Sequence, residues 1–154
     1  MSLRLAALVA LVCLAAGCTH RAAAPPPAPT PALRANDLPR VGRFAGTLPC
    51  ADCSGIDTEL ILAGDWDGRY LFQLTETYIG GPNGKRTVAC AGAWTTLRGT
   101  ARDAGAVVYQ LQPDPPGAQR AFVVIDERHI RLLGAGLEPL PSSVDATLTR
   151  VDGR

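Results

Sequence analysis

Two cysteines separated by two residues are the strongest chemical signal in this sequence. Cys50 and Cys53 stand in "LPCADCSGI" (residues 48–56), directly after Pro49. Such a CxxC pair serves as a redox switch, as a pair of metal ligands or as a small structural disulfide, and the cellular compartment decides among these uses. The spacing alone leaves all three roles open.

A third cysteine adds one more potential metal ligand and disulfide partner. Cys90, in "VACAGAW" (residues 88–94), falls in the same predicted domain. Two thiolates suit the soft ion Cu(I), and Cys90 would be a third sulfur ligand, whereas zinc prefers four ligands. The alternative is a buried inert thiol, because Cys90 shares a strand face with Trp94. In an oxidising compartment the three thiols of this domain, Cys50, Cys53 and Cys90, leave one cysteine unpaired after a disulfide forms. The sequence does not say which two of them pair.

The histidines give no ligand pattern beside these thiols. His129, in "DERHIRLL", is expected at the tip of a hairpin, and His20 has no partner in sequence. A copper(I) site is therefore restricted to Cys50, Cys53 and Cys90.

As a structural bridge, the CxxC pair is weak. Closing so short a loop contributes about 2 kcal/mol, against about 4 kcal/mol for a loop from Cys53 to Cys90. A thioredoxin-type enzyme needs its first cysteine at a helix N-terminus, and no helical pattern follows "CADCSGI". We therefore expect no enzymatic activity. Because the disulfide would stabilise the fold only weakly, a redox or metal-binding function of this pair stays a hypothesis beside the structural one.

Glu76 raises a separate question. In "YLFQLTETY" (residues 70–78) it shares a face with Leu74 and Tyr78, so alternation points its carboxylate inward. A buried carboxylate is costly without a partner. The candidate partners are Arg86, Arg98 and Arg120. Alternatively, a twist or bulge at the strand end turns Glu76 to water.

The N-terminus indicates export. A basic start, Met1 to Arg4, precedes the apolar run "LAALVALVCLAAG" (residues 5–17), which is shorter than the roughly 20 residues of a membrane-spanning helix. "LAAGC" (residues 14–18) resembles the lipobox of bacterial lipoproteins, which implies cleavage before Cys18 and acylation of Cys18. Because Thr19 follows, rather than aspartate, the resemblance implies an outer-membrane anchor facing the periplasm.

The chain then divides into three segments. Residues 1–17 are expected to be a lipoprotein signal peptide, and residues 18–40 the lipidated cysteine followed by a linker rich in proline and alanine. Such linkers extend by about 3 Å per residue and bury little surface. Residues 41–154 form one domain's worth of chain.

That domain is predicted to be all-β. Alternating runs such as residues 56–62 and 70–78 flank "GDWDG", whose Asp67-Gly68 is typical of a hairpin, and further short strands are separated by glycine, proline and aspartate. This pattern indicates an antiparallel barrel or sandwich. A formal net charge of +1 without a basic run excludes a nucleic-acid partner, and no phosphate-binding or serine-hydrolase motif is present.

Four strings together resemble the N-terminal domain of the NlpE family of copper-resistance-associated outer-membrane lipoproteins. They are "FAGTLPCADCSGIDTELIL" (residues 44–62), "LTETYIG" (74–80), "GAW" (92–94) and the closing "LEPL…ATLTRV". The resemblance implies a small lipocalin-like barrel bearing the CxxC pair. It also implies a role in sensing envelope stress and copper, with signalling to an inner-membrane sensor kinase of the Cpx type. The second, OB-like domain of the best-known members has no counterpart in these strings.

Three functions follow as hypotheses. The first is a non-enzymatic envelope-stress and copper-homeostasis lipoprotein that acts through its CxxC pair. The second is a lipocalin-like protein that binds a small apolar ligand and uses the CxxC disulfide only as a brace. The third, a thiol–disulfide enzyme, is the least supported.

Overall fold

The structure is a computed structural model that describes residues 33–81, 84–113 and 119–152. The expected signal peptide, Cys18, His20 and most of the linker lie outside the described residues, so these assignments stay predictions. No helix in the described ranges is both long enough and apolar enough to cross a membrane.

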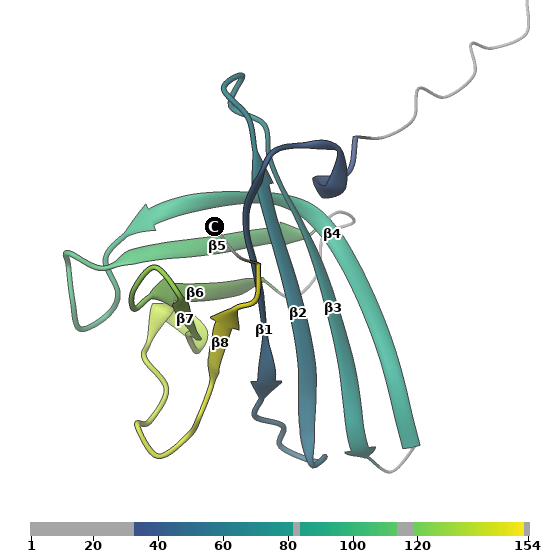
Figure 1. Cartoon of the computed structure of the whole chain (residues 1–154). Coiled ribbons are helices and arrows are strands. Elements are labelled where there is room, and N and C mark those ends of the chain that lie inside the picture. The colour runs from purple at the N-terminus through teal and green to yellow at the C-terminus, as the bar shows by residue number, and fades with distance from the viewer. Residues whose placement is uncertain (1–32, 82–83, 114–118, 153–154) are drawn as a thin grey trace, which may run out of the picture. The chain divides into compact units, whose positions relative to one another are not determined.

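The described chain folds into a closed antiparallel barrel (Figure 1). Each strand pairs with the next along the chain, and the last pairs back onto the first. The strands are β1 (Arg40–Leu48), β2 (Gly55–Gly64), β3 (Tyr70–Gly81), β4 (Gly84–Arg98), β5 (Val107–Pro113), β6 (Arg120–Val124), β7 (His129–Leu132) and β8 (Thr147–Arg150). Two short 3-10 turns, η1 (Ala35–Asp37) and η2 (Ala135–Leu137), complete the described elements. The predicted all-β barrel is confirmed.

Alternation along the strands builds the core, because successive side chains of a strand point to opposite faces. On β2, Leu60 and Leu62 point into the barrel and lie opposite Leu74 and Phe72 of β3. Trp94 of β4 closes the interior, where its indole N–H donates to the carbonyl of Ala63 at 2.9 Å. The shared inward face predicted for Cys90 and Trp94 is confirmed, since both pack against this core.

The outer face of β2 is partly covered as well. Ile61 and Ala63 point outward and are buried by Ala35 of η1, with Leu38 and Leu71 beside them. This contact fixes the start of the described chain against β2 and β3.

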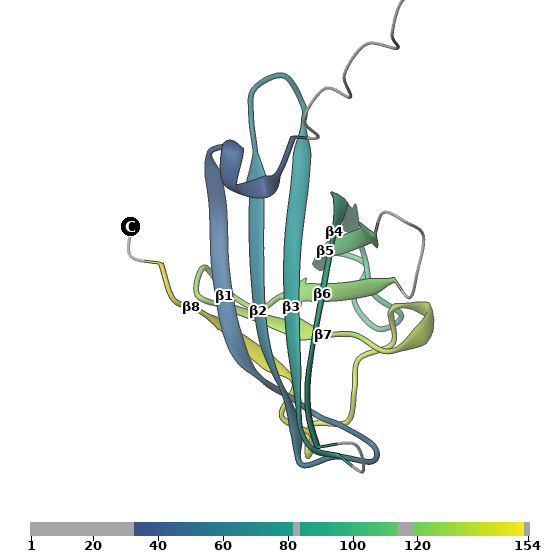
Figure 2. The same ribbon diagram turned by 90° about the vertical axis from the view of Figure 1, so that its right-hand side faces the viewer.

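Different elements of the chain lie at the two ends of the barrel (Figures 1 and 2). One, which we call the hairpin end, carries η1 and the β2–β3 turn at residues 65–69. The other, which we call the CxxC end, carries the β1–β2 turn at residues 49–54 and the adjoining ends of β3 and β4. The predicted Asp67-Gly68 hairpin is confirmed, because Gly64 pairs with Tyr70 and Gly68 has a φ of +79°. That positive φ is a conformation that glycine adopts without strain.

Candidate functional site

The CxxC pair closes the β1–β2 turn. Cys50 and Cys53 form a disulfide, with Cα atoms 5.3 Å apart, and both residues are partly exposed. The backbone N–H of Ser54 donates to the carbonyl of Ile79 at 2.7 Å, which ties this turn to the end of β3. Any side chain at Gly80 would collide with Ser54. The turn is therefore packed closely against its neighbour and still presents its disulfide to solvent.

Cys90 lies away from this pair. It is opposite Leu74 in the β3–β4 ladder, whereas Cys53 lies beside Gly81 at the far end of β3. Leu74 and Gly81 are seven positions apart on that strand, or about 23 Å. Cys90 is the free cysteine of the described chain. Burial raises the pKa of its thiol, the nearby carboxylate of Glu76 raises it further, and Arg120 opposes both effects.

These positions do not fit the three-sulfur copper site that the sequence suggested. The described residues contain no group of three or more potential metal ligands. An oxidised Cys50–Cys53 pair has no thiolate to offer, and Cys90 is too far away to complete a site with it. His129 is occupied elsewhere, since its Nδ1 lies 2.9 Å from the carboxylate of Asp126 at the β6–β7 turn.

Glu76 points into the barrel and is only 7% exposed. The alternative of a bulge that turns it to water is wrong, because the β2–β3 and β3–β4 ladders run regularly past Glu76 and the register shifts only beyond Tyr78. Of the three candidate partners, Arg120 is the one that faces it, with Nε 3.5 Å from a carboxylate oxygen. Arg86 lies instead over the ring of Tyr78.

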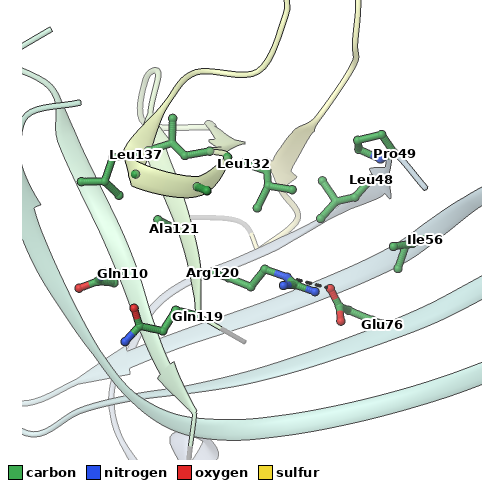
Figure 3. Close-up of a pocket in the computed structure, with 14 residues that line it drawn as sticks. Leu48, Pro49, Ile56, Glu76, Gln110, Gln119, Arg120, Ala121, Leu132 and Leu137 are labelled. Carbon is green, nitrogen blue, oxygen red and sulfur yellow. Dashed lines mark ion pairs between the residues drawn. The ribbon is translucent and has the colours of Figure 1, made fainter. Parts of the chain in front are cut away.

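The Glu76–Arg120 pair lies on the wall of a cavity of about 570 Å³ at the CxxC end (Figure 3). Leu48, Ile56 and Leu132 supply apolar walls, and Pro49, the residue before Cys50, forms part of the rim. The cavity and the disulfide are thus neighbours in the fold. Gln110 and Gln119 also line the cavity, and this mixture of apolar side chains, two amides and one ion pair has the chemistry of a site for a small amphipathic molecule.

Sequence reasoning named Arg120 only as one of three candidate partners of Glu76 and left two features of this region undetermined. The approach of Arg120 to Glu76 depends on how β6 crosses the barrel, and no local pattern reports that distance. The proximity of Pro49 to the ion pair likewise appears only once the barrel is closed. The inward alternation of Glu76 was the signal that led to this site.

Comparisons with known proteins place the chain in a family. Residues 44–143, well over half of the chain, match the family model described as the NlpE N-terminal domain. Lipoprotein NlpE of Escherichia coli K12 is 36% identical over 78 residues, which are 51% of this chain and 30% of that protein. The matched region therefore spans less than a third of that relative.

Two solved structures are also similar. The crystal structure of the Cpx pathway activator NlpE from Escherichia coli is 26% identical, covers 70% of this chain and 47% of its own, and has a TM-score of 0.49. A putative lipoprotein from Shewanella oneidensis is 22% identical, covers 77% of this chain and 94% of its own, and has a TM-score of 0.49.

Proposed function

This chain belongs to the NlpE family, and we propose that it is an outer-membrane lipoprotein that senses envelope stress without enzymatic activity. In this proposal residues 1–17 are the signal peptide, residues 18–40 the acylated Cys18 and its linker, and residues 41–154 the barrel. The lipobox-like string before Cys18 and the lipoprotein relative in Escherichia coli support the anchor. The protein would face the periplasm from the outer membrane.

The observation that carries the proposal is the disulfide in the β1–β2 turn. Reduction by a thiol reductant of the envelope adds two electrons and two protons and converts the bridge into two thiols. The strand ladders need no such bridge, because the β1–β2 pairing runs from Arg40 to Leu48 independently of it. The change is therefore a local change of surface at the CxxC end, which a partner protein can read while the barrel stays folded.

We propose a sensor kinase of the Cpx type as that partner. The solved structure from Escherichia coli is described as a Cpx pathway activator, and this chain matches part of it. No nucleic acid is expected as a partner, since the chain has a formal net charge of +1 and no basic run.

In this proposal copper binds at the same turn. Reduced Cys50 and Cys53 would be two thiolate donors of the kind that Cu(I) prefers. Copper resistance would then depend on this pair alone, because Cys90 lies about 23 Å away along β3.

The test is a chain with Cys50→Ser and Cys53→Ser, compared with a Cys90→Ser chain as the matched control. We expect the double variant to alter the envelope-stress response and copper tolerance while the barrel loses only about 2 kcal/mol of stability. The control should respond as the native chain does. A normal stress response in a stably produced double variant would contradict the proposal.

A second function is favoured by the cavity of about 570 Å³. There the protein binds a small amphipathic ligand, with Leu48, Ile56 and Leu132 around its apolar part and the Glu76–Arg120 pair near its polar part. Native mass spectrometry of protein purified from envelopes tests this function. A ligand that co-purifies with the native chain and is lost from an Ile56→Trp chain, in which the cavity is filled, would support it.

A further inference from the structure

A tryptophan stands almost fully exposed at the hairpin end of the barrel. Trp66, in the β2–β3 turn, is 98% exposed, whereas Trp94 is buried in the core. Contact of so large an apolar ring with water is unfavourable, and tryptophan is enriched where proteins meet a membrane interface or a partner. Trp66 lies outside every feature used above for function.

The turn that presents Trp66 is held in one conformation. A carboxylate oxygen of Asp65 accepts the backbone N–H groups of Asp67 and Arg69 at 3.0 and 3.1 Å. The Nε of Arg69 donates to the other oxygen of Asp65 at 2.6 Å. Because the turn is already ordered, little conformational entropy is lost when Trp66 makes a contact.

Other exposed apolar residues gather at the same end. Val41 stands at the start of β1, at the irregularity in the pairing with β2, and Tyr70 opens β3 opposite Gly64. Leu33, also exposed, is the first described residue and leads directly into η1, which packs on β2 and β3. Figures 1 and 2 show η1 and the β2–β3 turn at this one end. The described chain therefore begins at the same end of the barrel as the β2–β3 turn.

Charges at this end cancel. In residues 33–41 and 65–70, which form this end, Arg34, Arg40 and Arg69 stand against Asp37, Asp65 and Asp67, and Arg150 beside Val41 is paired with Asp152. Equal numbers of each sign give no net attraction to an anionic surface, so a contact here depends on apolar burial rather than on charge.

We propose that the hairpin end, with Trp66 at its tip, rests on the phospholipid surface in which acylated Cys18 anchors the chain. The inference depends on the proposed acylation of Cys18. From Cys18 to Leu33 the linker spans at most about 54 Å when fully extended. The barrel is therefore held near the surface, where its high local concentration makes a weak contact effective. The CxxC end then faces away from the membrane, toward partners in the periplasm.

The experiment uses the full acylated chain in phosphatidylcholine vesicles whose acyl chains carry bromine, a quencher of tryptophan fluorescence. We expect quenching of the native chain, loss of most of that quenching in a Trp66→Phe chain, and flotation of both with the vesicles. In vesicles that also contain anionic phosphatidylglycerol, raising the salt concentration should leave the quenching unchanged, because the charges at this end cancel.

A control places the probe at the opposite end of the same strand. In a chain with Trp66→Phe and Ile79→Trp, the new ring stands about 30 Å from Tyr70 along β3 and should not be quenched. Flotation with an unquenched Trp66, or equal quenching at position 79, overturns the inference while leaving the anchor intact. A chain that does not float with the vesicles overturns the anchor and the inference together.

Discussion

Cys90 is kept unreactive by its surroundings. Its thiol is half-buried on the inner face of β4, and its pKa is raised first by burial and then by Glu76. Since the thiolate is the reactive form, the folded protein should react slowly with alkylating reagents at neutral pH. The thiol also stays protonated in the folded protein at pH values where the unfolded chain ionises. Its contribution to stability is therefore complete below the ordinary pKa of 9.0 and is lost as the pH rises above it.

We predict that iodoacetamide at pH 8, without reductant, modifies Cys90 at least tenfold more slowly in the folded protein than in urea. Mass spectrometry of timed samples measures both rates. The Cys50–Cys53 disulfide should stay unmodified in both conditions, which provides an internal reference. Equal rates would show that Cys90 is open to solvent.

The Glu76–Arg120 pair is the second residue-scale feature that can be tested. Removing Arg120 leaves a carboxylate inside the barrel without its cation, which costs more than removing both charges. Because Arg120 is partly exposed, we predict that Arg120→Met lowers the free energy of unfolding by about 1–3 kcal/mol. A chain with Arg120→Met and Glu76→Gln should recover part of that loss in urea unfolding. Additive losses would mean that the two side chains do not interact.

At the scale of elements, the β2–β3 turn has a stability that depends on pH. Burial alone would raise the pKa of Asp65, but hydrogen bonds from the side chain and backbone of Arg69 outweigh burial and lower it. A lowered pKa in the folded protein stabilises it above the unfolded value of 3.8, and this stabilisation disappears as the pH falls through the folded value. The turn should therefore loosen in acid.

We predict that Asp65→Asn lowers the urea midpoint at pH 7 and that the difference from the native chain shrinks as the pH falls below 3.8. Asp57→Asn is the matched control, since Asp57 is an exposed acid on the same strand pair, hydrogen-bonded to Thr47. A difference that is constant with pH would assign the effect of Asp65→Asn to packing rather than to ionisation.

The elements differ in how far the sequence determines them. Local alternation was enough to place Leu60, Leu62 and Phe72 in the core, because a strand repeats every two residues whatever its partners. Asp67-Gly68 likewise identified the hairpin by its own turn chemistry. The partner of Glu76 was beyond such reasoning, since Arg120 is on a strand that reaches Glu76 only through closure of the barrel. The pairing of the three thiols is a matter of distance: Cys50 and Cys53 meet within one turn, whereas the register of β3 and β4 keeps Cys90 away from both, and sequence spacing alone did not settle this.

At the scale of the whole molecule, the barrel depends on a short seam. β8 closes it by pairing Arg150 with Phe44 and Thr149 with Ala45. The side chain of Arg150 strengthens this seam, because it donates to the carbonyls of Val41 at 2.9 Å and Glu127 at 3.1 Å. Its guanidinium also lies over the ring of Phe44, 5.2 Å from the centroid. One side chain thus joins β1, the β6–β7 turn and β8.

We predict that Arg150→Ala lowers the free energy of unfolding by about 2 kcal/mol, since it removes hydrogen bonds that bridge three segments. Opening should be local, so amide hydrogen exchange should accelerate at β8 and the start of β1 while the long β2–β3 ladder stays protected. Arg98→Ala, at the exposed end of β4, is the matched control and should change neither quantity. Uniform acceleration across the barrel would instead mean that the seam opens only with global unfolding, and that Arg150 supports the whole fold rather than its closure.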